Sequence, residues 1–281
     1  MGSLCCNDHG VTDARIDWHT IETVLCDLDG VIWLAHQPIP GSVEAVAALR
    51  ASGRRTLFVT NNSVAVRADH EAALATVGIA AVGDVVSSSM AAAHLVEPGE
   101  RVLVTGGPGV VEALEERGAV AVPNDGRTRS EVFDAVVVGL DRTFDYDRLT
   151  VATSALLRGA RLIATNTDST FPTPHGLVPG GGAIVAAVST ASGAVPIVAG
   201  KPHRPMADLI AAMLTIGRGV FDPDRTLMVG DRPEIDGRFA AHLGCRFALV
   251  RSGVPSAATE VGVTVDLDVD DLSAVAQVLL D

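Results

Sequence analysis

The chain has 281 residues, of which 48% are hydrophobic, and its formal net charge is −13. This length and apolar content predict a globular protein with a packed core and room for one inserted unit. The negative charge argues against nucleic acid or an anionic membrane as a partner, although it allows a local basic pocket for one phosphate. No apolar run approaches the roughly 20 residues that a membrane helix needs.

The first 20 residues are predicted to form a polar leader. His9, Asp13 and Arg15 interrupt this stretch, so it lacks the apolar core of a signal peptide. The chain has four cysteines, at Cys5, Cys6, Cys26 and Cys245. Two are adjacent near the terminus and two lie inside apolar runs, which is not the spacing of a disulfide framework. Cysteine usage therefore predicts a reducing, cytoplasmic location.

Strands and helices alternate from residue 21 onward. In chain order, the pattern predicts a strand over Thr23–Cys26, a helix over Gly41–Arg50, a strand over Thr56–Val59 and a helix over Ala65–Val77. The first strand ends on Asp27 and the second on Thr60. The β-branched runs are typical of buried strands in a parallel sheet.

The middle of the chain is predicted to be an inserted α/β unit over residues 89–195. Its expected elements are strands over Arg101–Val104, Asp134–Val138 and Arg161–Ala164, and a helix over Gly109–Arg117. The segment Ser169–Gly182 is too rich in proline and glycine for a regular element, so we expect a shaped loop there. A helix over Ala183–Ser192 follows.

The last part of the chain repeats the opening rhythm. Three further strands are predicted, over Ile197–Ala199, Thr226–Val229 and Arg246–Val250. Lys201 follows the first of them and Asp231 follows the second. Because the carboxyl ends of parallel strands form the ligand crevice of an open sheet, we expect these two residues to meet Asp27 and Thr60 there.

Asp27, Asp29 and Gly30 place two carboxylates two residues apart at a strand end. The first carboxylate can point into the crevice, and the turn can bring the second toward the same bound group. One carboxylate can then act as a nucleophile and the other as an acid and base. Taken alone, the Asp-Gly pair is equally well explained as a simple turn.

Three other groups supply the partners that phosphate chemistry needs. Thr60, Asn61 and Asn62 offer a hydroxyl and backbone N–H groups for phosphate oxygens, although alone they would more often cap a helix. Lys201 can neutralise a phosphate and a carboxylate, whereas a lone lysine is usually solvated. Asp231 and Asp236 add the hard oxygen ligands that Mg²⁺ prefers.

These four groups, in this order, resemble the four motifs of the haloacid dehalogenase (HAD) superfamily. The likeness extends to the branch with a large C2-type cap, the NagD, 4-nitrophenylphosphatase, phosphoglycolate and glycerol-phosphate phosphatase group. It is carried by the segments 27–33, 166–168 and 200–202, and by Pro172, Gly176, Pro179 and Gly180. The implied fold class is α/β: a Rossmann-like parallel-sheet core over 21–88 and 196–281, with an α/β cap over 89–195.

The resemblance implies a Mg²⁺-dependent phosphatase that forms an aspartyl-phosphate. Asp27 would be the nucleophile and Asp29 the acid and base. Phosphate would be held by the residues Gly30, Thr60, Asn61, Asn62 and Lys201. Mg²⁺ would bind Asp27, the backbone carbonyl of Asp29 and Asp231. Asp236 would support this site from behind; the fourth motif departs from its relatives at Ile235 and Gly237, beside that residue.

Substrate selection would then fall to the cap, because the core residues serve any small phosphate ester alike. Phe171 and His175 are the candidates, set against cap packing and a solvated loop as their ordinary explanations. A phosphotransferase or mutase with the same nucleophile is the nearest alternative, and a non-catalytic phosphate-binding or receiver-like module is a more distant one. Caps of this family frequently mediate dimers, so the resemblance also raises the expectation of a homodimer.

Overall fold

The computed structural model describes residues 16–127, 129–173, 176–218, 220–253 and 262–281. Within them, the larger sheet has six strands, all paired in parallel. Their order across the sheet is β15 (Leu267–Val269), β14 (Arg246–Val250), β13 (Thr226–Gly230), β1 (Thr23–Cys26), β4 (Arg55–Thr60) and β5 (Val85–Ser87). The strands that precede Asp27, Thr60 and Asp231 are therefore the three central neighbours β1, β4 and β13.

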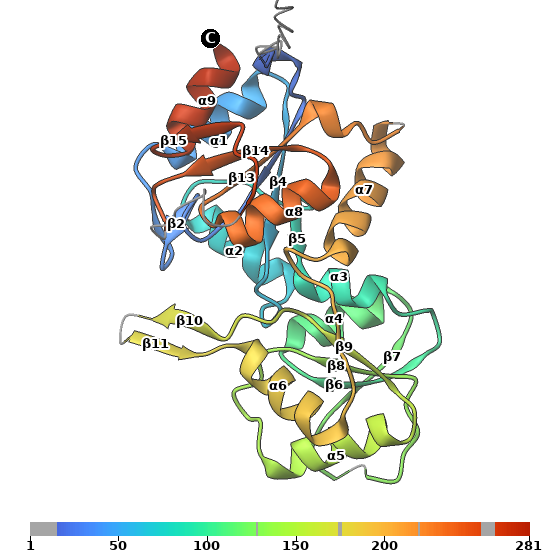
Figure 1. Cartoon of the computed structure of the whole chain (residues 1–281). Coiled ribbons are helices and arrows are strands. Elements are labelled where there is room, and N and C mark those ends of the chain that lie inside the picture. Colours follow the sequence, from blue (N-terminus) through green and yellow to red (C-terminus); the bar gives the residue numbers. More distant parts are fainter. Residues whose placement is uncertain (1–15, 128, 174–175, 219, 254–261) are drawn as a thin grey trace, which may run out of the picture.

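Helices cover both faces of this sheet (Figure 1). They are α1 (Ser42–Ala51), α2 (Arg67–Thr76), α3 (Ser88–His94), α7 (Arg204–Arg218), α8 (Arg238–Leu243) and α9 (Leu272–Leu280). Alternate residues of a strand point to opposite faces, so Val24 and Cys26 join a hydrophobic cluster with residues of α1 and α9. Leu25 between them joins the cluster formed with α7 and α8 on the other face.

Short elements complete this part of the chain. They are the 3₁₀ helices Trp18–Thr20 and Pro223–Arg225, the π-helical turn Pro233–Gly237, and the antiparallel pair β2 (Trp33–Leu34) and β3 (Gln37–Pro38). The π-helical turn and the β2–β3 pair both follow strands that end directly before a candidate site residue, Asp231 and Asp27 respectively. We call the six-stranded sheet with its helices and these elements the core part.

The second sheet has five parallel strands in the described residues. Their order is β12 (Ile197–Val198), β9 (Arg161–Ala164), β8 (Ala135–Val138), β6 (Arg101–Thr105) and β7 (Val120–Pro123). The helices of this part are α4 (Pro108–Glu116), α5 (Tyr146–Leu157) and α6 (Gly181–Ser192). We call this sheet, its helices and the hairpin described below the cap part; it is the lower half of Figure 1.

Two expectations from the sequence are wrong. Ile197–Val198 was expected beside the strands of Asp27 and Asp231, but it pairs with β9 in the cap part. A two-residue strand carries too little pattern to identify its sheet. The expected loop Ser169–Gly182 contains an antiparallel hairpin of β10 (Thr170–Thr173) and β11 (Gly176–Pro179). A proline such as Pro172 is tolerated there because each strand of a two-stranded hairpin has an unpaired edge.

The two parts share one hydrophobic cluster. It contains Leu25 and Leu57 of the core part together with Val102 and Val110 of the cap part. At the junction, the N–H of Gly109 in α4 donates to the carbonyl of Val64 at 3.0 Å. A Cβ on Gly109 would overlap the backbone of Ala65, so only glycine allows this close approach.

None of the helices in the described ranges combines the length and apolarity that crossing a membrane requires.

Candidate active site

Asp27 occupies the carboxyl end of the central strand β1, with only 7% of its surface exposed. Its backbone N–H donates to the carbonyl of Val229 at 3.0 Å and continues the pairing with β13. Its Oδ1 accepts the N–H of Leu28 at 2.8 Å. Among the described residues, no hydrogen bond or ion pair reaches its Oδ2. The carboxylate is thus held by one oxygen and presents the other to the site.

Lys201 lies between two carboxylates, with its side chain buried. Its Nζ is 2.9 Å from Oδ1 of Asp27 and 2.7 Å from Oδ1 of Asp236. Burial by itself lowers the pKa of Lys201, but the charges of Asp236 and Asp27 more than offset this, and the net shift is upward. Lys201 is therefore a permanently charged ammonium at neutral pH. It reaches the site from the loop after β12, an edge strand of the other sheet.

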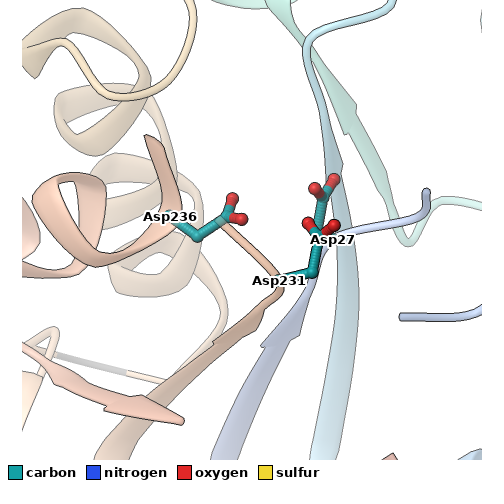
Figure 2. A group of neighbouring side chains, drawn as sticks. All are labelled: Asp27, Asp231 and Asp236. Atoms are coloured by element: carbon teal, nitrogen blue, oxygen red, sulfur yellow. The ribbon is translucent and has the colours of Figure 1, made fainter. Parts of the chain in front are cut away.

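Asp27, Asp231 and Asp236 form a compact group of carboxylates (Figure 2). Each offers an oxygen, and these oxygens all lie within 4.8 Å of one another. Asp231 is 3% exposed at the end of β13. A Cβ at Gly30, which has φ +86°, or at Gly253 would overlap the Asp231 carboxylate. Two glycines far apart in sequence thus leave the space that this carboxylate occupies.

Asp236 is completely buried in the π-helical turn after β13. Its Oδ1 contacts Lys201, and its Oδ2 accepts the backbone N–H of Arg232 at 3.2 Å. Burial raises the pKa of Asp236 to about 7; Lys201 opposes this shift, and the Asp27 charge adds to it. Because both of its oxygens already have partners, Asp236 serves chiefly to hold Lys201.

Asp29 lies at the start of the turn toward β2; part of its surface is exposed, and the surrounding site covers the rest. The indole N–H of Trp33 donates to its Oδ1 at 3.1 Å. The tight turn is closed by a hydrogen bond of 2.8 Å from the N–H of Gly30 to the carbonyl of Trp33. Desolvation within the site, followed by the nearby charge of Asp27, raises the pKa of Asp29. A raised pKa suits a carboxyl group that must carry a proton.

The segment Thr60–Asn62 begins at the last residue of β4, beside the strand of Asp27. The hydroxyl of Thr60 accepts the N–H of Asn62 at 3.1 Å, which leaves its own hydrogen available to donate. The side chain of Asn62 is exposed, and its Oδ1 accepts the N–H of Val64 at 3.0 Å. The loop is therefore held in a bent conformation by its own side chains.

Asn61 connects the core part to the cap part. Its Nδ2 donates to the carbonyl of Lys201 at 3.0 Å and more weakly to Oδ2 of Asp168 at 3.4 Å. Its own carbonyl accepts the hydroxyl of Ser88 at 2.7 Å and Nδ2 of Asn166 at 2.8 Å. Asn61 thus links β4 both to the loop that carries Lys201 and to the cap part.

The two candidate residues for substrate selection stand apart from this cluster. Phe171 is half-buried in β10, with the guanidinium of Arg142 over its ring at 5.9 Å. The hairpin that carries it projects from the side of the cap part (Figure 1). His175 lies outside the described residues. A role of either residue in substrate selection stays a prediction.

Two side chains near the site had no role in the sequence analysis. Trp33 orients Asp29, but the hydrogen bond depends on a turn whose conformation the sequence does not specify. Arg232, directly after Asp231, carries a half-buried guanidinium. The sequence itself could have pointed to Arg232. It directly follows Gly230 and Asp231 at the end of a central strand, so its backbone has to lie close to the crevice.

The carboxylates fit a divalent cation of the Mg²⁺ type. This ion prefers hard oxygen ligands and usually takes one or two carboxylates together with water. With Asp236 occupied by Lys201, the two buried carboxylates left for a cation are Asp27 and Asp231. Their separation and the glycine-lined space beside Asp231 agree with this donor set.

Comparison with known proteins gives a consistent result. The family model described as haloacid dehalogenase-like hydrolase matches residues 24–120, and a second HAD-hydrolase-like model matches residues 198–275. A D-glycerol 3-phosphate phosphatase of Mycobacterium tuberculosis is 39% identical over 84% of this chain, a match that spans 64% of that protein. An acid sugar phosphatase of Staphylococcus saprophyticus is 34% identical, with 75% of this chain and 79% of that protein covered.

Solved structures agree. The glycerol phosphate phosphatase of M. tuberculosis, crystallised with magnesium, superposes with a TM-score of 0.81 at 33% identity, covering 94% of this chain and 79% of that one. A 4-nitrophenylphosphatase of Thermotoga maritima gives 0.81 at 29% identity, with 92% and 98% covered. With its motifs assembled around Asp27 and its relatives matched over most of their length, this chain belongs to the haloacid dehalogenase-like hydrolases.

Proposed function

We propose that the chain is a Mg²⁺-dependent phosphatase that hydrolyses small phosphate monoesters through an aspartyl-phosphate on Asp27. The observation that carries this proposal is the buried ion pair of Asp27 with Lys201, beside the carboxylates of Asp231 and Asp236. A carboxylate with one oxygen bound and the other directed into a crevice has the arrangement of a nucleophile. The named relatives, a D-glycerol 3-phosphate phosphatase and an acid sugar phosphatase, support the same activity.

In the first half-reaction, Oδ2 of Asp27 attacks the phosphorus of the ester. The bond between phosphorus and the ester oxygen breaks as the new bond forms, and the protonated carboxyl of Asp29 gives its proton to the leaving oxygen. The raised pKa of Asp29 supports this role, because it increases the fraction that carries a proton. Trp33 keeps the carboxyl oriented toward the site.

In the second half-reaction, Asp29 is a carboxylate and takes a proton from water. The water oxygen attacks the phosphorus of the aspartyl-phosphate, and the bond to Asp27 breaks. Inorganic phosphate leaves, and both aspartates return to their starting states. The same group thus serves first as an acid and then as a base, which is why a single turnover needs no other proton carrier.

The transferring phosphoryl group is held by the ammonium of Lys201, the hydroxyl of Thr60 and backbone N–H groups near Gly30, Asn61 and Asn62. Phosphoryl transfer depends chiefly on positioning and on neutralising charge. Lys201 supplies a fixed positive charge, because its two carboxylate partners keep it protonated.

Mg²⁺ would be held by Asp27, the backbone carbonyl of Asp29 and Asp231, and it supplies further charge neutralisation for the phosphoryl oxygens. Asp236 keeps Lys201 in place from behind. Asn61 holds the lysine loop through its hydrogen bond to the carbonyl of Lys201.

Phosphate release from a panel of small esters, measured with Mg²⁺ and with a chelator, tests the proposal. The matched variant Asp27→Asn keeps the shape of the side chain and removes the nucleophilic charge, so turnover should fall on the order of 10⁴-fold or more. Multiple turnovers by the natural chain separate a phosphatase from a receiver-like module, and free phosphate rather than an isomer separates it from a mutase. Release that persists in Asp27→Asn would assign the nucleophile elsewhere.

A cytoplasmic location and a homodimer belong to the same proposal. Cys26 and Cys245 are free thiols in the structure, as thiols of cytoplasmic proteins usually are. Burial raises the pKa of each to about 12, which makes both thiols unreactive. Light scattering coupled to size-exclusion chromatography checks the dimer. A mass of one chain at micromolar concentration would argue against it.

A further inference from the structure

The tip of the β2–β3 hairpin is a strained turn. The register of the two strands leaves a connection of two residues, Ala35 and His36. Among the described residues, these are the only ones other than glycine with a positive φ, at +49° and +63°. A hairpin turn of this kind requires positive φ at both central positions, which glycine and asparagine adopt most readily. Strain beside a catalytic group draws attention to the side chain that the turn places.

The turn places the imidazole of His36 against the indole of Trp33. The two ring centroids are 5.0 Å apart and the ring planes are tilted by 48°, which is a usual geometry for packed aromatic rings. Within the described part of the chain, the imidazole makes no hydrogen bond or ion pair, so this ring contact is what places it. His36 is exposed, whereas Trp33 is only 2% exposed. The imidazole therefore covers part of an indole that lies directly beneath the surface.

The covered indole is the one that holds the acid. Its N–H donates to Oδ1 of Asp29 at 3.1 Å. A hydrogen bond is stronger where water does not compete for its donor. Loss of the imidazole would expose part of the indole to water and remove a surface that keeps its plane fixed. An effect of His36 on catalysis would thus pass through Trp33 to Asp29.

We propose that His36 is a positioning residue for the acid of the reaction: its ring fixes the indole of Trp33, and the indole N–H fixes the carboxyl of Asp29. The inference rests on the proposed phosphatase function and deepens it by naming what aligns the proton donor. The leaving oxygen of an alkyl ester needs a proton as its bond to phosphorus breaks, so the alignment of Asp29 matters most for such esters. Nitrophenolate is a stable anion that leaves without a proton.

The test compares kcat/KM for glycerol 3-phosphate, an alkyl ester, with kcat/KM for 4-nitrophenyl phosphate. Both values report on the first half-reaction, in which Asp29 is the acid. In His36→Gly, glycine adopts the turn without strain, so the hairpin is kept and only the ring is lost. The alkyl-to-aryl ratio should fall about 3- to 10-fold, the range expected for loss of one hydrogen bond. Ala35→Gly relaxes the neighbouring turn residue but keeps the ring, and should leave the ratio unchanged.

His36→Phe separates the ring of His36 from its charge. Desolvation and the charge of Asp27 raise the pKa of Asp29, and a positive charge on His36 lowers it. The phenyl ring keeps an aromatic contact and carries no charge, so this variant should retain most of the natural ratio. A ratio as low as that of His36→Gly would assign the effect to charge and overturn the inference.

A double variant tests whether His36 acts through Trp33. In Trp33→Phe, the indole N–H is absent, so adding His36→Gly should lower the ratio no further. A full additional fall would mean that His36 contacts the substrate itself, and the inference would be overturned.

The ratio does not depend on how much of a variant is folded, since the same active molecules hydrolyse both esters. An unchanged ratio in His36→Gly would also overturn the inference. Phosphate release from neither ester, even by the natural chain, would instead overturn the proposed phosphatase function.

Discussion

The two sheets of this molecule are both parallel, but different kinds of residue lie at the carboxyl ends of their strands. In the core part, the central strands end on or just before charged residues: Asp27 after β1 and Asp231 after β13. In the cap part, β6 ends on Thr105 and β9 ends just before Thr165, and both residues are neutral. Thr165 shares a hydrogen bond of 3.0 Å with Ser63 of the core part. In both sheets, the carboxyl ends of the strands form one edge. The residues at these strand ends decide whether that edge carries out chemistry or contacts the other part of the molecule.

The largest effect should come from separating Lys201 from Asp236. Asp236→Ala leaves a buried ammonium with one partner fewer, which should cost about 3–5 kcal/mol of unfolding free energy. The double variant Lys201→Met/Asp236→Leu should recover much of this stability and remain inactive. Urea unfolding followed by circular dichroism measures both. A loss below about 1 kcal/mol in Asp236→Ala would contradict the reading of this pair as a buried ion pair.

The next largest effect concerns metal binding at the charged strand ends of the core part, Asp27 and Asp231. Mg²⁺ at about 100 times its dissociation constant should stabilise the natural chain by about 2.7 kcal/mol, seen as a rise in Tm. Asp231→Asn should abolish most of that rise, because one of two carboxylate ligands loses its charge. Asp268→Asn changes an exposed carboxylate of the same sheet that pairs with Arg251, and serves as the control. If Mg²⁺ raised the Tm of both variants equally, the ion would not be bound by Asp231.

A smaller effect is expected from Trp33→Phe. This change keeps an aromatic ring and removes the hydrogen bond to Oδ1 of Asp29. Loss of one such bond corresponds to about a 3- to 10-fold decrease in kcat, with little change in KM if Trp33 only orients the acid. Steady-state kinetics with 4-nitrophenyl phosphate measure it. A change confined to KM would mean that Trp33 contacts the substrate instead.

The smallest effect is expected at the neutral strand ends of the cap part. Thr105→Val removes the acceptor of a buried hydrogen bond of 2.9 Å from Nδ2 of Asn124. Because Asn124 also donates to the carbonyl of Arg148, the cost should be about 1 kcal/mol in unfolding free energy, with kcat unaltered. A fall in kcat as large as that in Trp33→Phe would show that the strand ends of the cap part also contribute to catalysis.

Elements with strong apolar patterns could be predicted closely from the sequence. The strands Thr23–Cys26, Arg161–Ala164 and Arg246–Val250 have the expected bounds, because buried β-branched runs between polar breaks have few alternatives. The hairpin β10–β11 could not be foreseen, since its proline and glycine content indicates a loop and its pairing comes from geometry.

For the site, the strand ends of one sheet were enough to bring Asp27 and Asp231 together, and Lys201 also reaches Asp27 as expected. The route of Lys201 was not foreseen, because which sheet takes Ile197–Val198 depends on the exposed edge of β9. The hydrogen bond of Trp33 to Asp29 and the position of the Arg232 guanidinium depend on turn conformations. Local sequence does not fix those conformations.

The placement of β12 bears on how such proteins can be recombined. Residues 197 and 198 complete the sheet of the cap part, and three residues later the chain delivers the ammonium that neutralises Asp27. A chimera that exchanges the cap between two family members at residue 195 would pair a foreign β9 with the recipient's β12. Crossing over after Lys201 would transfer the strand and the lysine loop as one module, although the donor's loop would then have to fit the recipient's Asp236. The inserted unit is thus joined to catalysis through its last strand.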